Sequence, residues 1–332
     1  MKDANGNVAT NFGGSVTFSQ TTGSGSLTGL GSVNAVSGVA TISLTGNAAG
    51  SVTIKATASS IDSNTLTFNV IAGALNKFAI ANISSPQTAG SAFGITITAQ
   101  DANSNTVPSF TNTVNLSTTA GAITPTVSGA FAAGVRTENV TVTQAGLGKT
   151  ITATRTGGGE TGTSNTFDVN AGALAKFAIS NISTQTAAVA FSVTITAQDA
   201  NNNTVTGFTS TVDLSTNAGT ISPVVSGAFV SGVRTESAVS VTLAGTGKTI
   251  TAKRTGGSET GTSNSFTVNA GALNHFAVEA AGGGNIGSHT VGVASISREQ
   301  RKTWPTIPSP AMMPTATRHK SPPAGLCRQV AD

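Results

Sequence analysis

The sequence predicts an all-β protein made of tandem sandwich modules of about 100 residues, joined end to end. Two markers recur in step. The segment AGALNKFAIA begins at Ala72, and its counterparts begin at Ala171 and Ala270, 99 residues apart each time. Turn-forming segments begin at Asp3, Asp101 and Asp199, 98 residues apart each time. A period near 100 residues is that of a whole domain and is longer than a solenoid repeat.

Within one period, apolar and polar residues alternate with period two, which is typical of strands with one buried face. Turn signals separate these runs about every 8 to 14 residues, and no helical period is present. The pattern predicts about seven short strands and matches an immunoglobulin-like β-sandwich. In the module that begins at Ala171 the expected strands are 177–182, 191–197, 212–214, 221–229, 239–243, 249–253 and 266–268.

Phenylalanine is expected to form the core of each complete module, because the modules contain neither a tryptophan nor a disulfide. Each buried phenylalanine contributes about 1.5–3 kcal/mol. The predicted core phenylalanines are Phe78, Phe93, Phe110, Phe131 and Phe167, and Phe177, Phe191, Phe208, Phe229 and Phe266.

The charge balance gives the modules no electrostatic reason to bind nucleic acid. Charged residues are only 9% of the chain, against about 25% in ordinary globular proteins. Residues 1–294 hold eleven basic and eleven acidic residues, so the net charge of +4 arises entirely from residues 295–332. We therefore expect no nucleic-acid partner. No apolar run approaches the ~18 residues of a membrane helix, so we expect no membrane insertion.

The modules hold no cysteine, since Cys327 is the only one in the chain. Residues 1–6 contain no apolar segment of the signal-peptide kind. A domain array of this composition predicts an extracellular or cell-surface location and a piece of a longer exported protein.

The repeat predicts five regions. Residues 1–71 are a module that lacks its first two strands, 72–170 and 171–269 are complete modules, and 270–294 begin a fourth. We expect the first region to be the least stable folded part and to have an exposed sheet edge. Short joints without a proline or Gly/Ser spacer predict limited bending, and the expected partners of each module are its neighbours.

The β pattern stops after Ala294, where proline, methionine and basic residues become frequent. A reading frame one base earlier permits Phe at 295, Ile at 297 and Thr-Ala at 300–301, as in the second module. We therefore interpret 295–332 as a frameshifted module sequence, and the alternative is a disordered proline-rich tail.

Two motifs suggest ligand sites. Oxygen-bearing side chains at alternate positions resemble part of a calcium loop, although the acidic residue expected at position 12 is replaced by Asn112 and Ser210. An Asx turn is the main interpretation, with calcium as the alternative and no other cofactor expected. The candidate calcium ligands are Asp101, Asn103, Asn105, Asp199, Asn201 and Asn203. The segments AGLGKT at Ala145 and AGTGKT at Ala244 resemble phosphate-binding loops, but they lack the first glycine and are interpreted as hairpin turns.

No catalytic set can be assembled within a complete module, so the chain is not expected to be an enzyme. His275, His289 and His319 all lie after the third module. Arg136 and Glu138 lie two apart on one strand face and predict a surface ion pair, as do the equivalent Arg234 and Glu236.

The segments DANGNVATNFGGSVTFS at Asp3, DANNNTVTGFTSTVDLST at Asp199 and SGVRTESAVSVTLAG at Ser231 resemble the bacterial immunoglobulin-like repeats of invasin- and intimin-type surface adhesins. The resemblance covers residues 1–294 and implies tandem rods that project a tip from the cell. It predicts a structural stalk or spacer. The alternatives are a module that binds carbohydrate or a host protein, and a spacer of a secreted hydrolase. The ligand is unknown.

Overall fold

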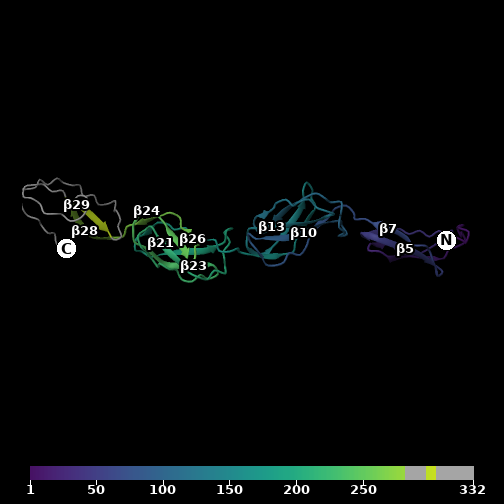
Figure 1. Ribbon diagram of the computed structural model, residues 1–332, viewed down its shortest axis with the longest axis horizontal. Helices are drawn as coiled ribbons and strands as arrows, with labels where there is room; N and C mark the ends of the chain where they lie inside the picture. The colour runs from purple at the N-terminus through teal and green to yellow at the C-terminus, as the bar shows by residue number, and fades with distance from the viewer. Residues whose placement is uncertain (281–296, 304–332) are drawn as a thin grey trace, which may run out of the picture. The chain divides into compact units, whose positions relative to one another are not determined.

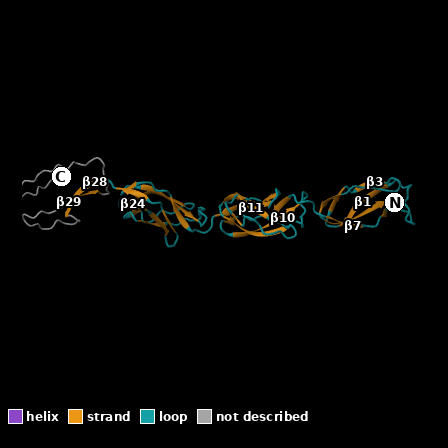
Figure 2. Ribbon diagram, turned by 90° about the horizontal axis from the view of Figure 1, so that it is seen from above, coloured by secondary structure: helices purple, strands orange, loops and turns teal. Residues whose placement is uncertain are grey.

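The computed structural model describes residues 1–280 and 297–303, and within these ranges all regular structure is β-strand (Figure 2). The chain divides into two compact units, Met1–Gly172 and Ala173–Asp332. Three separate hydrophobic cores lie in residues 16–58, 78–169 and 177–268. The predicted all-β class is confirmed.

The second module contains ten short strands, three of which were not predicted as strands: β9, β14 and β16. Its strands are β8 (Lys77–Ile80), β9 (Gln87–Thr88), β10 (Ala92–Gln100), β11 (Val114–Thr118), β12 (Ile123–Thr124), β13 (Val135–Val142), β14 (Gly146–Lys149), β15 (Ile151–Arg155), β16 (Thr161–Thr163) and β17 (Phe167–Asn170).

The strand order identifies this module as an immunoglobulin-like sandwich. One sheet has the order β12-β13-β10-β8, and Figure 1 labels its two central strands. The opposing strands have the orders β11-β15-β16 and β14-β17-β9. In the constant-type immunoglobulin fold, strands one, two, five and four form one sheet and strands three, six and seven form the other. The strands β8, β10, β13 and β12 match the first set, and β11, β15 and β17 match the second.

Alternation along the strands places one residue in two inside the sandwich. In β10, the side chains of Ile95, Ile97 and Ala99 are buried, whereas the threonines between them are half-buried. Phe78, Phe110 and Phe131 form a cluster with ring centroids 4.9 to 5.8 Å apart, in which Phe110 meets both other rings edge-on. The predicted phenylalanine core is therefore confirmed, although Phe93 and its counterpart Phe191 are only partly buried.

One glycine lets the edges of the two sheets approach closely. Gly162 in β16 lies against the backbone of Phe78 in β8, and a Cβ at this glycine would lie 1.9 Å from the Phe78 carbonyl oxygen. Gly261 has the same relation to Phe177 in the third module. A side chain at either position would force the strands apart.

The third module repeats this topology, with sheet orders β18-β20-β23-β22, β21-β25-β26 and β19-β27-β24. The predicted strand at 239–243 is the end of a longer strand, since β23 spans Val233–Val241, and the predicted strand at 177–182 ends at Ile179. Of the predicted strand at 221–229 only Ile221–Ser222 forms. Its strands are β18 (Lys176–Ile179), β19 (Gln185–Thr186), β20 (Phe191–Gln198), β21 (Val212–Thr216), β22 (Ile221–Ser222), β23 (Val233–Val241), β24 (Gly245–Lys248), β25 (Ile250–Arg254), β26 (Thr260–Thr262) and β27 (Phe266–Asn269).

The first module has a much smaller core. Its buried cluster consists of Val16, Ala35 and Ala58, whereas 19 residues form the buried cluster of the second module. The main sheet has the order β3-β1-β5-β6, with β7 also paired to β5, and β2 pairs with β4. The strands are β1 (Ser15–Thr22), β2 (Ser26–Thr28), β3 (Gly31–Asn34), β4 (Thr45–Ala48), β5 (Gly50–Ala58), β6 (Ile61–Asp62) and β7 (Leu66–Val70).

The start of the fourth module forms β28 (Leu273–Ala280), which pairs antiparallel with β29 (Ser297–Thr303). The sequence did not predict β29. Phe276 pairs with Arg301, and Val278 pairs with Glu299, which is the register of Phe78 with Ala99 and Ile80 with Ile97 in the second module. The remainder of the predicted tail and of the fourth module lies outside the described residues.

Candidate functional site at a module joint

The repeated Asp-x-Asn-x-Asn segment forms the same tight loop in all three modules. The Oδ1 atom of Asp101 accepts hydrogen bonds from the backbone N–H groups of Asn103 and Asn105, at 2.9 and 2.8 Å. Asp3 and Asp199 accept the corresponding bonds in the first and third modules. An aspartate that accepts the N–H of the residue two places on forms an Asx turn. The Asx-turn interpretation of this segment is therefore confirmed.

The second carboxylate oxygen of Asp101 holds the segment that connects the first module to β8. Its Oδ2 atom accepts the backbone N–H of Gly73 at 2.9 Å and the side-chain amide of Asn105 at 2.9 Å. Asp101 is only 4% exposed. Four N–H donors therefore surround a nearly buried carboxylate, as burial of a charge requires.

Asn105 extends this network to the first module. Its Oδ1 atom accepts the backbone N–H of Ala49 at 2.8 Å, and its Nδ2 atom donates to the carbonyl oxygen of Asn47 at 2.9 Å. Both groups of one amide side chain are thus bonded to the end of β4 and to Ala49, which links β4 to β5, while the same Nδ2 donates to Asp101. One loop therefore contacts the first module and the connecting segment that leads into β8.

The hydrogen bonds lower the pKa of Asp101 below its ordinary value of 3.8, with the Asn105 side chain as the largest cause. The N–H groups of Gly73, Asn105 and Asn103 act in the same direction. Donors that point at a carboxylate stabilise its charged form. Asp101 is consequently an anion at neutral pH, and its bonds to the joint are charge-assisted.

A hollow of about 370 Å³ lies at this joint. Its lining comes from the first module at Gly46 and Val70, from the connecting segment, and from the Asp101 loop. Ile71 in the connecting segment is 83% exposed. The joint therefore presents an apolar side chain beside a polar network.

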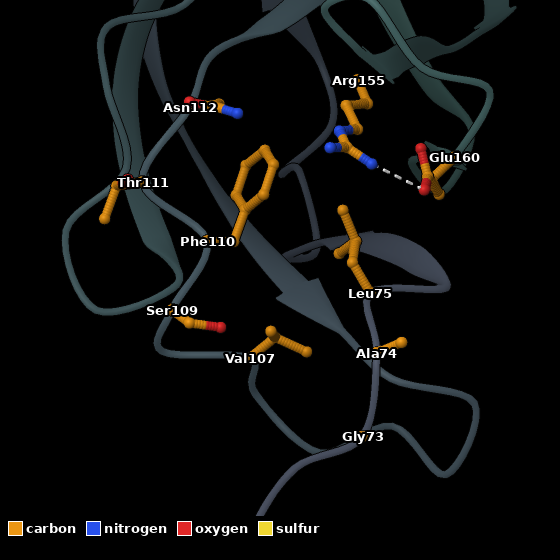
Figure 3. A pocket seen from close by; sticks show the side chains of 10 residues that line it. All are labelled: Gly73, Ala74, Leu75, Val107, Ser109, Phe110, Thr111, Asn112, Arg155 and Glu160. Atoms are coloured by element: carbon orange, nitrogen blue, oxygen red, sulfur yellow. Dashed lines mark hydrogen bonds and ion pairs between the residues drawn. The ribbon is translucent and has the colours of Figure 1, made fainter.

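A second hollow, of about 380 Å³, shares Gly73, Ala74 and Leu75 of the connecting segment with the first. Figure 3 shows the ring of Phe110 and the side chain of Leu75 forming its apolar wall, with Arg155 donating to Glu160 across the top of the view. The Arg155 Nη1 to Glu160 Oε1 distance is 3.0 Å. None of the ten lining residues is a histidine or a cysteine. The hollow offers groups for polar recognition and shows no nucleophile with a base.

The structure does not test the calcium prediction for Asp101, Asn103, Asn105, Asp199, Asn201 and Asn203. Calcium sites place six to eight oxygens around the ion. At Asp101 the oxygens face three N–H donors from the loop itself and the N–H of Gly73 from the connecting segment. Within residues 1–280 and 297–303, no group of three or more His, Cys, Asp or Glu residues is placed to hold a metal ion.

The two glycine-lysine segments are strands and not hairpin turns, which corrects the sequence interpretation. Gly146 to Lys149 form β14, which pairs with β17, whereas the next strand β15 pairs with β11. Positive φ angles at Gly146 and Gly148 accompany a shift of register in this strand. The chain therefore crosses between two sets of strands here, and no helix follows to bind phosphate.

Both predicted ion pairs form, but their carboxylates are not surface groups as predicted, since the side chains of Glu138 and Glu236 are only 13% and 10% exposed. The distance from Arg136 Nη2 to Glu138 Oε2 is 2.9 Å. The distance from Arg234 Nε to Glu236 Oε1 is 2.7 Å. Each glutamate also accepts a backbone N–H, from Gly129 or from the equivalent Gly227. The pKa of Glu236 is lowered, chiefly by Arg234. These pairs therefore fix the loop before β13 and β23.

In the part of the chain that the structure describes, no helix has the length and apolar character of a membrane span. Of the three histidines, only His275 lies in a described range, where it is part of β28. His289 and His319 lie outside the described residues.

No protein-family model and no curated protein matches the chain. Among solved structures, it is similar to the Escherichia coli adhesin FdeC, with 22% identity and a TM-score of 0.34 over 80% of this chain and 89% of that one. It is also similar to invasin, a bacterial integrin-binding protein, with 18% identity and a TM-score of 0.30 over 84% of this chain and 57% of that one. Domains 4–9 of the surface layer protein SbsC match with 17% identity and a TM-score of 0.24, over 84% and 43% of the two chains. The strand order within the second and third modules, and not these matches, establishes the fold.

Sequence reasoning identified the loop but missed what it binds. The two repeat markers, which contain Gly73 and Asp101, keep almost the same spacing in each copy. That constant spacing was the available signal that the two segments touch. Asn47 and Ala49 contribute only backbone atoms, so no side-chain pattern could have revealed them.

Proposed function

We propose that the chain is a structural stalk or spacer segment of an extracellular, adhesin-like surface protein. The observation that carries this proposal is the joint between the first two modules, where the Asp101 loop bonds to both sides. A spacer must transmit position from one module to the next, and interdomain motion is the default where few contacts cross a joint.

The joint meets this requirement through polar contacts. Asn105 makes two hydrogen bonds to the first module, and Asp101 anchors Gly73 of the connecting segment. Each such bond contributes about 0.5–1.5 kcal/mol, and bonds to a charged group contribute more. Three together are sufficient to favour one arrangement of the joint over freely jointed ones.

The cores support the same function. Each complete module has its own buried cluster, 19 residues in the second and 18 in the third. A module with a core of its own can be repeated along the chain, because it does not need a particular neighbour to bury its apolar side chains. A hydroxyl-rich surface with only 9% charged residues suits an extracellular array.

The test compares Asn105→Ala with Asn103→Ala in the full chain. Asn103 takes part in the loop through its backbone N–H, so the second variant keeps the loop and the joint bonds. Spin labels at Thr67→Cys and Asn139→Cys, both exposed, report the distance between the two modules, with Cys327→Ser removing the native thiol.

We expect a narrow distance distribution in the parent and in Asn103→Ala, and a broader one in Asn105→Ala. If the parent distribution is as broad as that of Asn105→Ala, the joint does not hold the modules and the stalk proposal fails.

A further inference from the structure

A short strand near the start of each complete module pairs with the last strand of the same module, and the two strands run parallel. In the second module β9 pairs with β17, and in the third module β19 pairs with β27. The backbone N–H of Ala89 continues the first contact by donating to the carbonyl oxygen of Asn170 at 2.9 Å. Ala187 donates to Asn269 in the same way, also at 2.9 Å. This contact therefore joins the start of each module directly to its end.

An asparagine side chain lengthens the parallel contact. The Oδ1 atom of Asn165 accepts the backbone N–H of Ile83 at 2.8 Å, and its Nδ2 atom donates to the carbonyl oxygen of Ile83 at 3.0 Å. Asn264 makes the same two bonds to Ile182, at 2.7 and 2.9 Å. An asparagine amide carries both a donor and an acceptor. The side chain thus takes the place of a peptide group and extends the pairing to a residue that precedes the short strand.

Burial and a further hydrogen bond support the same contact. The side chains of Ile83 and Ile182 are each only 4% exposed, so the residues that the asparagines bind are anchored in the cores. In the second module the hydroxyl of Ser85 also accepts the backbone N–H of Asp168 at 2.9 Å. We call the bonded segments the end clamp. It consists of residues 83–89 with 165–170 in the second module, and of 182–187 with 264–269 in the third.

The parallel direction decides how the end clamp responds to tension. A stalk under load is pulled at the start and at the end of every module, which draws the two segments of the clamp in opposite directions along their own axes. The bonds between them are then loaded together, and none is peeled open ahead of its neighbours. Tension reaches the clamp of the second module through β8, whose four residue pairs with β10 are loaded first.

We propose that the end clamp is the force-bearing element of each complete module, and that Asn165 and Asn264 are the side chains that strengthen it. The proposal rests on the proposed stalk function, since only a chain under tension needs such an element. If the asparagines served only to fix a loop, their bonds would add stability without regard to the direction of pulling. The two roles therefore differ in what happens when the chain is pulled from its ends.

The test holds the full chain between an amino-terminal biotin and the thiol of Cys327, and it measures unfolding rates at constant tension. A complete module has 99 residues, so its unfolding releases about 30 nm of extended chain and can be recognised by that length. Asn165→Ala removes both side-chain bonds from the second module. The third module of the same molecule keeps its clamp and is the internal reference.

Ser128→Ala is the matched control, because it removes hydrogen bonds from the second module at a place outside the end clamp. The Ser128 hydroxyl bonds to Val114 in β11 and to the Gly129 carbonyl. We expect both variants to lower the urea unfolding midpoint of the module. Under tension we expect Asn165→Ala to speed unfolding about tenfold and Ser128→Ala to speed it less than about twofold. Asn264→Ala should transfer the tenfold effect to the third module.

Equal acceleration by Asn165→Ala and Ser128→Ala under tension overturns the proposal, because the asparagine bonds would then act without regard to direction. No acceleration by Asn165→Ala in a module that its urea midpoint shows to be folded also overturns it. If Asn165→Ala prevents folding, Ser85→Ala replaces it, since this variant removes one clamp bond at an exposed position. It should speed unfolding under tension more than Ser128→Ala does, and the reverse order overturns the proposal.

The outcome is separable from that of the spin-label experiment on the joint. A broad distance distribution in the parent contradicts the stalk proposal but leaves the unfolding rates of the single modules unchanged. Equal rates for the clamp variant and its control contradict the end clamp but leave the distance distribution unchanged.

Discussion

The first and second modules begin their fifth-strand segment with the same turn and a valine, yet only the second forms a paired strand there. Val39 and Val135 both bridge back across the turn, to Val36 and Ala132. Beyond them, β13 pairs with β10, and residues 40–44 pair with nothing in the described chain. Strand formation at this place therefore depends on the neighbouring strand more than on local propensity.

The same difference explains the two cores. A sandwich needs both sheets to exclude water, and β8 and β10 supply the centre and one edge of one sheet in the second module. Without counterparts of these strands, the first module keeps three residues in its buried cluster. The prediction that the first module is the least stable folded part follows from this contrast and remains a prediction.

The largest expected effect is at the phenylalanine cluster. Phe78→Ala removes the ring that contacts both Phe110 and Phe131 in the second module, and we expect a loss of about 3–5 kcal/mol in unfolding free energy. The matched change in the first module, Phe18→Ala, affects a partly buried ring and should cost less. Denaturant-dependent hydrogen exchange of each module measures both. Equal losses would contradict the contrast between the cores.

The second largest loss of stability is expected where the two sheets of the second module approach closely. Gly162→Ala places a methyl group against the Phe78 backbone, and we expect a cost of about 1–3 kcal/mol. Gly159→Ala is the control, because nothing lies within 4 Å of a Cβ at that glycine. The thermal unfolding midpoint of the second module distinguishes the two. A control as costly as Gly162→Ala would refute the steric explanation.

A buried serine provides a polar test of the same module. The Ser128 hydroxyl accepts the N–H of Val114 and donates to the Gly129 carbonyl, and the residue is 5% exposed. Ser128→Ala leaves the Val114 N–H without this acceptor and should cost about 1–3 kcal/mol. Ser109→Ala, at an exposed position, should be neutral. The urea unfolding midpoint measures the difference between the two variants. Equal midpoints would contradict the prediction and would indicate that water replaces the Ser128 hydroxyl.

Acid should release the joint over a defined pH range. The pKa of Asp101 is lower in the folded protein than its ordinary value of 3.8, so its stabilising contribution is complete above that value and is lost as the pH falls through the folded pKa. Asp101→Asn should remove this dependence, measured as the hydrogen exchange of Gly73 against pH. A joint that loosens between pH 7 and 5 would contradict the assignment.

The smallest expected effect is at the ion pair of the second module. Arg136 is about one-third exposed, so solvent screens its pairing with Glu138. Arg136→Met should change the unfolding free energy by less than about 1 kcal/mol. A larger loss, seen in the same urea experiment, would show that the pair holds the loop at Gly129 more firmly than its exposure indicates.

The sequence was sufficient for the fold because period-two alternation and the core phenylalanines act within each module. It was sufficient for the Asx turn because Asp101 bonds to its own neighbours in the chain. It was not sufficient for the joint, because the Asn105 side chain binds backbone atoms of Asn47 and Ala49 that carry no sequence signal. The strand β14 was missed for a related reason, since Gly146 and Gly148 are typical of turns and the strand depends on pairing with β17.

The most direct test of the account is a native-state hydrogen-exchange measurement on the full chain. It compares the amides of residues 40–44 with those of their counterparts at 136–140 in β13. The account predicts that the first set exchanges near the rate of an unstructured chain, while the second is strongly protected by pairing with β10. Comparable protection in both sets would contradict it.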